Sequence, residues 1–190
     1  MEHIANSIEA CVNARNWHAA LALALAVPDI CGQIEYPEWA GPGHAGKRYP
    51  KWFDVWVRER LFRIGHDGKE FPMSGDDCYA LRNAYLHTGV KEARPPEKAG
   101  YKLIVPTAGN LAHMSTAGAG DESIVLYVGT EPFCAGICDG VREWSASIVE
   151  RRPESRAEID GLLNIIEGEV TVTYTAVVGN FIVTNTSTMR

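Results

Sequence analysis

A run of nine apolar residues, Ala19 to Val27, constrains the fold of this chain more than any other feature. The run is about half as long as a membrane span requires, so we expect a helix that the rest of the protein buries. Asn16 is placed to cap this helix, which is expected to begin at Trp17 and to bend or end at Pro28. The run therefore predicts a helical protein built around this segment, with no part in a membrane.

Three more segments carry apolar residues at helical spacing, near residues 4–12, 50–61 and 130–150. Pro50 suits the first turn of the middle segment, where a proline removes no helical hydrogen bond. A short last helix is predicted within 153–166. The middle segment offers aromatic rings on which bases could stack, but their helical spacing is more typical of a core. These rings belong to Trp52, Phe53 and Trp56.

Two β-strands are predicted later in the chain, at 101–105 and 123–128, around a Gly- and Ala-rich loop at 107–120. Alternating β-branched residues in the tail, 168–190, indicate a hairpin or a loose extension. The sequence has no evident repeat or domain linker. We therefore predict one domain over 1–190, a mainly α protein whose helical bundle carries a small β addition.

The composition fits a cytoplasmic protein, since the five cysteines leave at least one unpaired and the amino terminus lacks the basic start of a signal peptide. The net charge of −6 argues mildly against nucleic-acid binding. The distribution is less unfavourable, because Lys47 to Lys102 holds 12 of the 18 basic residues and only 8 of the 24 acidic ones. The middle of the chain is therefore the part that could face a polyanion.

Residues 74–89, SGDDCYALRNAYLHTG, are predicted to form one helix with well-marked ends. Ser74 and Asp77 have the spacing of a capping box at the amino end. Gly89 can take the left-handed conformation that stops a helix. Polar side chains inside this helix, where a buried helix would carry leucines, therefore need a reason.

One face of this helix gathers groups that can act on a phosphodiester. On a helical wheel, Arg82, Asn83 and His87 fall on one side, and Tyr79 and Asp76 lie between Arg82 and His87. An arginine grips phosphate, and a histidine in the last turn, where the dipole favours imidazolium, can exchange protons near neutral pH. Such a face could transesterify RNA without a metal. The ordinary alternative is an arginine that extends to solvent and a histidine that caps carbonyls.

The stretch RNAYLH, residues 82–87, resembles the R-x4-H signature of the HEPN superfamily, including a polar residue after the arginine. Blocks between about residues 15 and 145 resemble a bacterial HEPN family of small proteins, whereas the carboxy-terminal part of the chain matches less clearly. The resemblance implies a four- to five-helix bundle that dimerises and joins two R-x4-H helices in one cleft. It also implies Arg82 and His87 as the catalytic pair and Asn83 as their polar support.

Many HEPN proteins are metal-independent ribonucleases of toxin–antitoxin, phage-defence or RNA-processing systems, which makes an endoribonuclease our first hypothesis. Tyr79 and Asp76, on the same face, are its candidate substrate-binding residues. The resemblance implies a homodimer, an RNA or nucleotide ligand, an antitoxin as a possible partner, and no metal or cofactor. The alternative is a non-catalytic HEPN module that binds RNA, a nucleotide or a partner protein. The net charge of −6 favours this alternative.

Other candidate sites are weaker. GPGHAGKR, residues 41–48, begins like a Walker A motif, but Arg48 replaces the Ser or Thr that holds magnesium, and a loop is the better interpretation. Cys134 and Cys138 could bind zinc together, although without a second pair they are expected in the core. The remaining candidates are His18, expected to be a core or interface residue, and Asp29 and Glu35, each either a cleft residue, a cap or a solvated charge.

Overall fold

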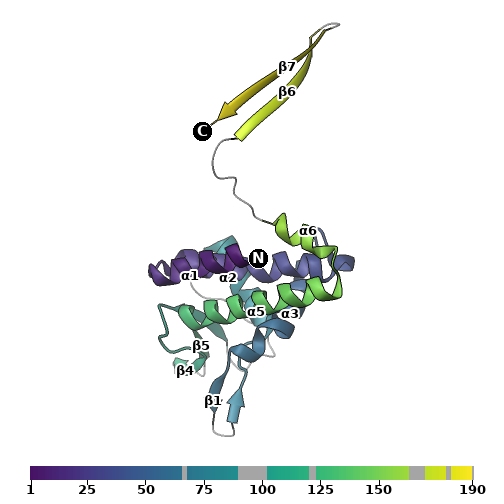
Figure 1. Ribbon diagram of the computed structural model, residues 1–190. Coiled ribbons are helices and arrows are strands. Elements are labelled where there is room, and N and C mark those ends of the chain that lie inside the picture. Colours follow the sequence, from purple (N-terminus) through teal and green to yellow (C-terminus); the bar gives the residue numbers. More distant parts are fainter. Residues whose placement is uncertain (66–67, 90–101, 120–122, 163–169, 179–180, 190) are drawn as a thin grey trace. The chain divides into compact units, whose positions relative to one another are not determined.

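The computed structural model divides the chain into two compact units, Met1–Asp160 and Gly161–Arg190 (Figure 1). The second unit contains an antiparallel hairpin, β6 (Val170–Val178) with β7 (Phe181–Met189), in the tail for which the sequence predicted β structure. The first unit contains the helices and all of the candidate site residues. The structure describes residues 1–65, 68–89, 102–119, 123–162, 170–178 and 181–189.

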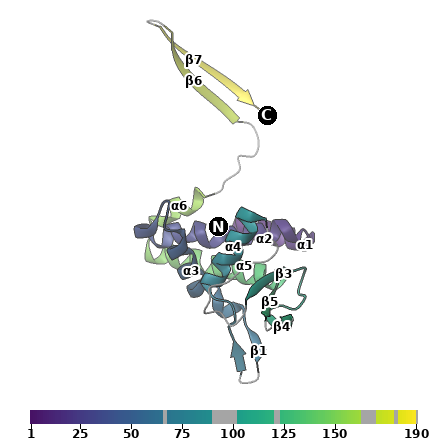
Figure 2. The same ribbon diagram turned by 180° about the vertical axis from the view of Figure 1, so that it is seen from behind.

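The first unit is a mainly helical bundle with small sheets at its edge (Figures 1 and 2). Helix α2 lies at its centre and packs against α1, α3, α4 and α5. The bundle helices are α1 (Glu2–Asn13), α2 (Trp17–Glu35), α3 (Ala45–Trp56), α4 (Gly75–Asn83), α5 (Thr130–Arg151) and α6 (Ser155–Asp160). Short helical turns η1 (Pro37–Trp39) and η2 (Arg58–Arg60) follow α2 and α3, and η3 (Ala84–Thr88) continues α4.

Helix α2 begins as predicted, because Asn16 Oδ1 accepts the Ala19 N–H. The expectation that Pro28 would end it is wrong, since the helix runs on through Pro28 to Glu35. A proline inside a helix costs about 3 kcal/mol, and the burial of Cys31 and Ile34 beyond it supplies a compensating gain. Of the described helices, α2 is the one long and apolar enough to cross a membrane, yet half of its apolar stretch is buried in the bundle, as in a soluble protein.

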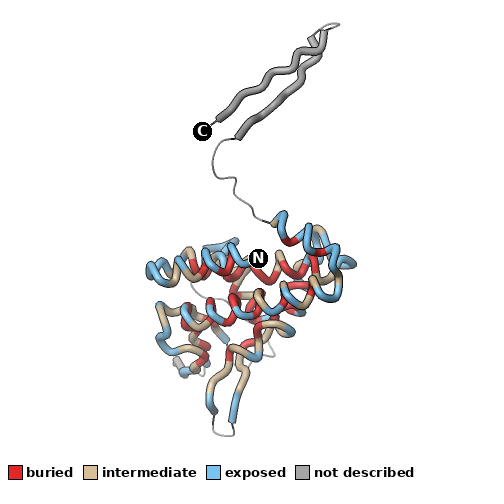
Figure 3. Tube along the Cα trace, viewed as in Figure 1, coloured by how far each residue is buried: buried red, intermediate tan, exposed pale blue. Residues whose placement is uncertain are grey.

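The core lies between α2, α3 and α5, where Figure 3 shows the buried positions facing one another. The rings of Trp52 and Trp144 meet edge to face there, 6.1 Å apart, and Phe53 is also fully buried. The aromatic stripe of α3 is therefore core rather than a stacking surface, apart from the half-buried Trp56. Helix α3 begins at Ala45, so the expected start at Pro50 is wrong; burial of the residues around Pro50 holds the helix across it.

Both predicted strands are present, as β3 (Leu103–Thr107) and β5 (Ser123–Gly129), and they pair in parallel. The expected loop between them contains a third strand, β4 (Ser115–Ala119), which pairs with β5 in antiparallel fashion. Gly and Ala have low strand propensity, so the residue types of this segment did not indicate a strand. The strand is defined by its backbone pairing with β5. A second small sheet pairs β1 (Arg63–Gly65) with β2 (Gly68–Glu70).

Helix α4 runs antiparallel to α3, and the backbones of the two helices approach each other closely at Gly75 and Pro50. A Cβ added to Gly75 would lie 2.2 Å from the Pro50 carbonyl oxygen, whereas one added to Gly46 would lie 3.5 Å from the Tyr79 ring. The first contact is with rigid backbone and leaves no room for a methyl group. The register places Gly75 beside Pro50 and Tyr79 beside Gly46, so Arg82 lies near the amino end of α3.

These two glycines should respond oppositely to alanine. Gly75→Ala forces α4 away from α3, and we expect it to lower the free energy of unfolding by more than about 2 kcal/mol. Gly46→Ala meets only an ordinary contact inside a helix, so it should be neutral or stabilising by up to about 1 kcal/mol. Urea unfolding curves of both variants provide the measurement, and equal midpoints would contradict the close packing of the two helices.

Candidate functional site

The predicted capping box opens α4. The Ser74 N–H donates to Asp77 Oδ2 at 2.8 Å, and the Asp77 N–H donates to Ser74 Oγ at 3.3 Å. Gly89 stops the segment at φ 65°, also as predicted. The prediction of one continuous α-helix is wrong, because α4 ends at Asn83 and the five residues Ala84–Thr88 form a π-helical turn. Such turns are rare and often occur at functional sites.

The π turn brings together the two residues of the R-x4-H spacing. An α-helix would place Arg82 and His87 about 140° apart, but π-helical hydrogen bonds join residues five apart, so positions i and i+5 come close. Arg82 Nη1 accordingly lies 2.7 Å from His87 Nε2 and donates to Asn83 Oδ1 at 2.9 Å. The candidate catalytic residues Arg82, Asn83 and His87 therefore form one hydrogen-bonded group, which we call the Arg–Asn–His triad.

The Arg82–His87 contact fixes the form of the imidazole. A guanidinium is always a hydrogen-bond donor, so Nε2 must be the acceptor and carries no proton. The ring proton then resides on Nδ1, and the paired ring is neutral. An imidazolium would have no lone pair to accept from Arg82, so it could not keep this contact. His87 itself is exposed to solvent.

Tyr79 supports the triad from one turn earlier. The Cζ atom of Arg82 lies 5.9 Å from the centre of the Tyr79 ring, within the range of a cation–π contact. The Tyr79 ring is tilted against that of Tyr49, 5.3 Å away, and is thereby tied to the core. Tyr79 therefore holds the guanidinium, whereas the prediction that it binds substrate stays a prediction.

Asp76 lies elsewhere on α4. It is exposed in the first turn of the helix, beside Asp54. Burial raises the pKa of Asp54, and the neighbouring Asp76 carboxylate adds to the increase. Asp54 accepts the Gly75 N–H at 2.8 Å, so this carboxylate pair belongs to the start of α4 rather than to the triad.

A carboxylate on α2 and an arginine on α3 complete the surroundings of Arg82. Asp29 Oδ2 lies 3.6 Å from Arg82 Nη2, and Asp29 Oδ1 accepts from Arg48 Nε at 2.8 Å. Arg48 is only 4% exposed and also donates to the carbonyls of Trp39 and Gly41, at 2.8 Å each. Asp29 is thus a half-buried ion-pair partner rather than a cap or a solvated charge, and sequence reasoning missed Arg48.

The structure also shows the contacts made by the weaker candidates in the amino-terminal half. Arg48 binds the carbonyls of Trp39 and Gly41. The loop interpretation of the Walker-like segment holds only for residues 41–44, because residues 45–48 form the first turn of α3. Glu35 pairs with Arg151 at 2.9 Å and accepts the Trp144 indole N–H at 2.9 Å, so it is not a solvated charge. His18 is exposed, so the expectation that it belongs to the core is wrong. Its Nδ1 atom lies 2.6 Å from the hydroxyl of Tyr85, which ties the start of α2 to the π turn.

The cysteines carry no metal site within the described residues. Cys134 and Cys138 are buried in α5, and burial raises the pKa of each thiol to about 12. They are core residues, as the sequence favoured, and no described group of three or more His, Cys, Asp or Glu side chains has metal-binding geometry. Cys31 and Cys78 are buried too, whereas Cys11 is partly exposed.

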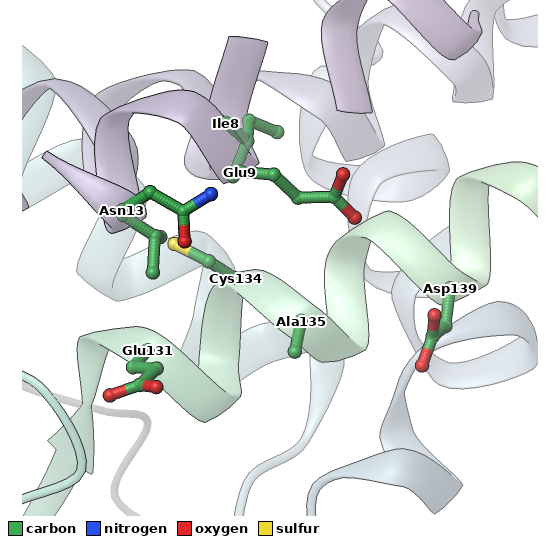
Figure 4. Close-up of a pocket in the computed structure, with 8 residues that line it drawn as sticks. Ile8, Glu9, Asn13, Glu131, Cys134, Ala135 and Asp139 are labelled. Carbon is green, nitrogen blue, oxygen red and sulfur yellow. The ribbon is translucent and has the colours of Figure 1, made fainter. Parts of the chain in front are cut away.

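A hollow of about 310 Å³ lies between α1 and α5 (Figure 4). Its lining includes the carboxylates of Glu9, Glu131 and Asp139, but Glu9 is already held by Arg142 at 2.6 Å. The hollow is lined by residues of α1 and α5 only, so it is separate from the triad on α4. We assign it no chemical role.

Comparison with protein families, with curated proteins and with solved structures found no match.

The triad predicts a specific tautomer of His87. In the wild-type protein above neutral pH, the ring should be protonated at Nδ1 and bare at Nε2, because Arg82 donates to Nε2. Arg82→Ala should remove this preference. Nitrogen chemical shifts of the imidazole, measured by NMR, distinguish the two forms, and the exposed His44 serves as the control ring. A wild-type His87 protonated at Nε2 would contradict the contact.

Proposed function

We propose that this chain is a HEPN-type, metal-independent endoribonuclease that works as a homodimer, in a toxin or phage-defence setting. The observation that carries the proposal is the 2.7 Å contact of Arg82 with His87 across the π turn, with Asn83 fixing the guanidinium. The R-x4-H spacing and the mainly helical bundle support assignment to the HEPN superfamily. The proposed substrate is single-stranded RNA.

The proposed reaction starts with the neutral imidazole. When the scissile phosphate binds Arg82, the guanidinium turns from His87 to the phosphate oxygens and releases Nε2. That nitrogen then takes the proton of the ribose 2′-hydroxyl as the 2′-oxygen attacks phosphorus. Arg82 stabilises the negative charge that grows on the phosphoryl oxygens. Both groups act on atoms of one phosphodiester, which their spacing permits.

The second proton comes from a second histidine. The bond from phosphorus to the 5′-oxygen breaks, and the leaving oxygen needs a proton. His87 of the partner subunit supplies it, once its own Arg82 has turned away and Nε2 has taken a proton from water. The products are a 2′,3′-cyclic phosphate and a 5′-hydroxyl end. One imidazole has gained a proton and the other has lost one, so exchange with water restores the starting state. This requirement for two imidazoles is the chemical reason to propose a homodimer.

A non-catalytic module that binds RNA, a nucleotide or a partner protein such as an antitoxin is the second candidate. The observation that favours it is that the lone pair of His87 is already occupied by Arg82. The net charge of −6 and the Asp29 carboxylate beside Arg82 point the same way, since both weaken attraction for a polyanion. The two candidates differ in whether a product forms.

Cleavage of a labelled single-stranded RNA in the presence of a chelator tests the proposal. His87→Ala should lower the rate by about 10²–10⁴-fold, because a general base is lost. Arg82→Ala should lower it by about 10²–10³-fold, because charge stabilisation is lost. Lys69→Ala on β2 is the control for a lost surface charge and should leave the rate unchanged.

The products distinguish the candidates. Cleavage should leave cyclic phosphate ends, and a substrate with 2′-deoxyribose at every position should stay intact. If wild type cuts no faster than the variants but binds RNA saturably and Arg82→Ala does not, the binding module replaces the enzyme.

The homodimer is tested separately by sedimentation equilibrium. At micromolar concentration the wild-type protein should have twice the mass of the chain, because the proposed reaction needs a second His87. The exposed Leu86 lies beside His87 and gives a matched test, since Leu86→Asp should weaken the dimer and lower the rate together. A wild-type protein that is monomeric and fully active would disprove the composite site.

A further inference from the structure

We propose that Asp29 is a positioning residue for Arg82, and that it competes with the substrate phosphate for the same guanidinium. The inference rests on the proposed function for its catalytic part and on geometry alone for its binding part. It assigns a role to the α2 carboxylate and to its clamp, Arg48, which the R-x4-H spacing does not include.

The guanidinium of Arg82 is only partly satisfied. Its Nη1 atom contacts both Asn83 and His87, which uses both Nη1 hydrogens. Its Nη2 atom lies 3.6 Å from Asp29 Oδ2, near enough for attraction but too far for a hydrogen bond. Its Nε atom is buried, and no described group accepts from it. Arg82 therefore keeps donors at Nη2 and Nε that a phosphate can take once the side chain turns.

Asp29, in contrast, is held in place and cannot move with Arg82 when the arginine side chain turns. Arg48 Nε holds its Oδ1 atom at 2.8 Å, and Arg48 is in turn fixed by the carbonyls of Trp39 and Gly41. The clamp is buried, with Arg48 only 4% exposed. The second oxygen of Asp29 consequently faces Arg82 at a set distance. This attraction orients the guanidinium so that Nη1 points to His87.

The same attraction opposes anion binding. The side chains of Arg82 and Asp29 are 17% and 20% exposed, so their pairing is screened less than a surface salt bridge. A phosphate that approaches Arg82 must displace Asp29 and also meets its negative charge. Asp29 thus weakens binding of the substrate while it aligns the arginine for the reaction. Removing its charge should therefore change binding and turnover in opposite directions.

Asp29→Asn tests this division. The asparagine has the same shape and still accepts from Arg48, but it no longer attracts or repels charge. We expect it to bind a 2′-deoxy oligonucleotide, which cannot be cleaved, about two- to fivefold more tightly. We expect the turnover number on RNA to fall by on the order of tenfold, because Arg82 is less well aligned. Asp54→Asn, another half-buried ion-paired aspartate, is the matched control and should change neither.

Two readouts separate positioning from a structural role. The His87 ring of Asp29→Asn should show a weaker Nδ1–H preference by NMR, because Nη1 of Arg82 is less firmly aimed at Nε2. Asp29→Asn should unfold at a lower urea concentration than Asp54→Asn, because the buried Arg48 loses its counter-charge, so both readouts are taken well below that midpoint. Weaker or unchanged oligonucleotide binding, or an unchanged ring, would overturn the proposal. If the wild-type protein cuts no RNA, the enzyme hypothesis fails, while the binding and NMR measurements still decide the role of Asp29.

Discussion

The burial of α2 is the constraint on which the rest of the first unit depends. A helix that is apolar on most sides needs neighbours on most sides, and α1, α3, α4 and α5 supply them. The same helix carries Asp29 in its second half, where full solvation is no longer possible. A half-buried carboxylate needs a cationic partner, and Arg48 and Arg82 meet that need. The packing of one apolar helix thus leads directly to the placing of two arginines.

The π turn lies where the side chains of Arg82 and His87, five positions apart in the sequence, come into contact. His87 follows Arg82 by five positions, which is one more than an α-helix brings into line. Slipping the backbone hydrogen bonds from i+4 to i+5 aligns them, and the Tyr85–His18 contact anchors the slipped turn to α2. In this chain the five-residue spacing of Arg82 and His87 therefore coincides with the π turn.

Local features could be predicted from the sequence, and features set by distant partners could not. The caps at Asn16 and Ser74 and the stop at Gly89 depend on residues within one turn, so propensity and spacing identify them. The gathering of Arg82, Asn83 and His87 was equally local. The roles of Asp29 and Arg48 were missed, because their partners lie on other helices and a single sequence does not record that contact.

The sulfur chemistry of the chain has a practical consequence. Four thiols are enclosed by the bundle, and the Tyr49 hydroxyl lies 3.4 Å from the sulfur of Cys78 on α4, the helix that carries Arg82. Burial keeps such groups protonated and slow to react, whereas Cys11 on α1 is partly open to solvent. A maleimide spin label or fluorophore can thus be attached at one native position, so the proposed homodimer can be examined by distance measurement without rebuilding the molecule.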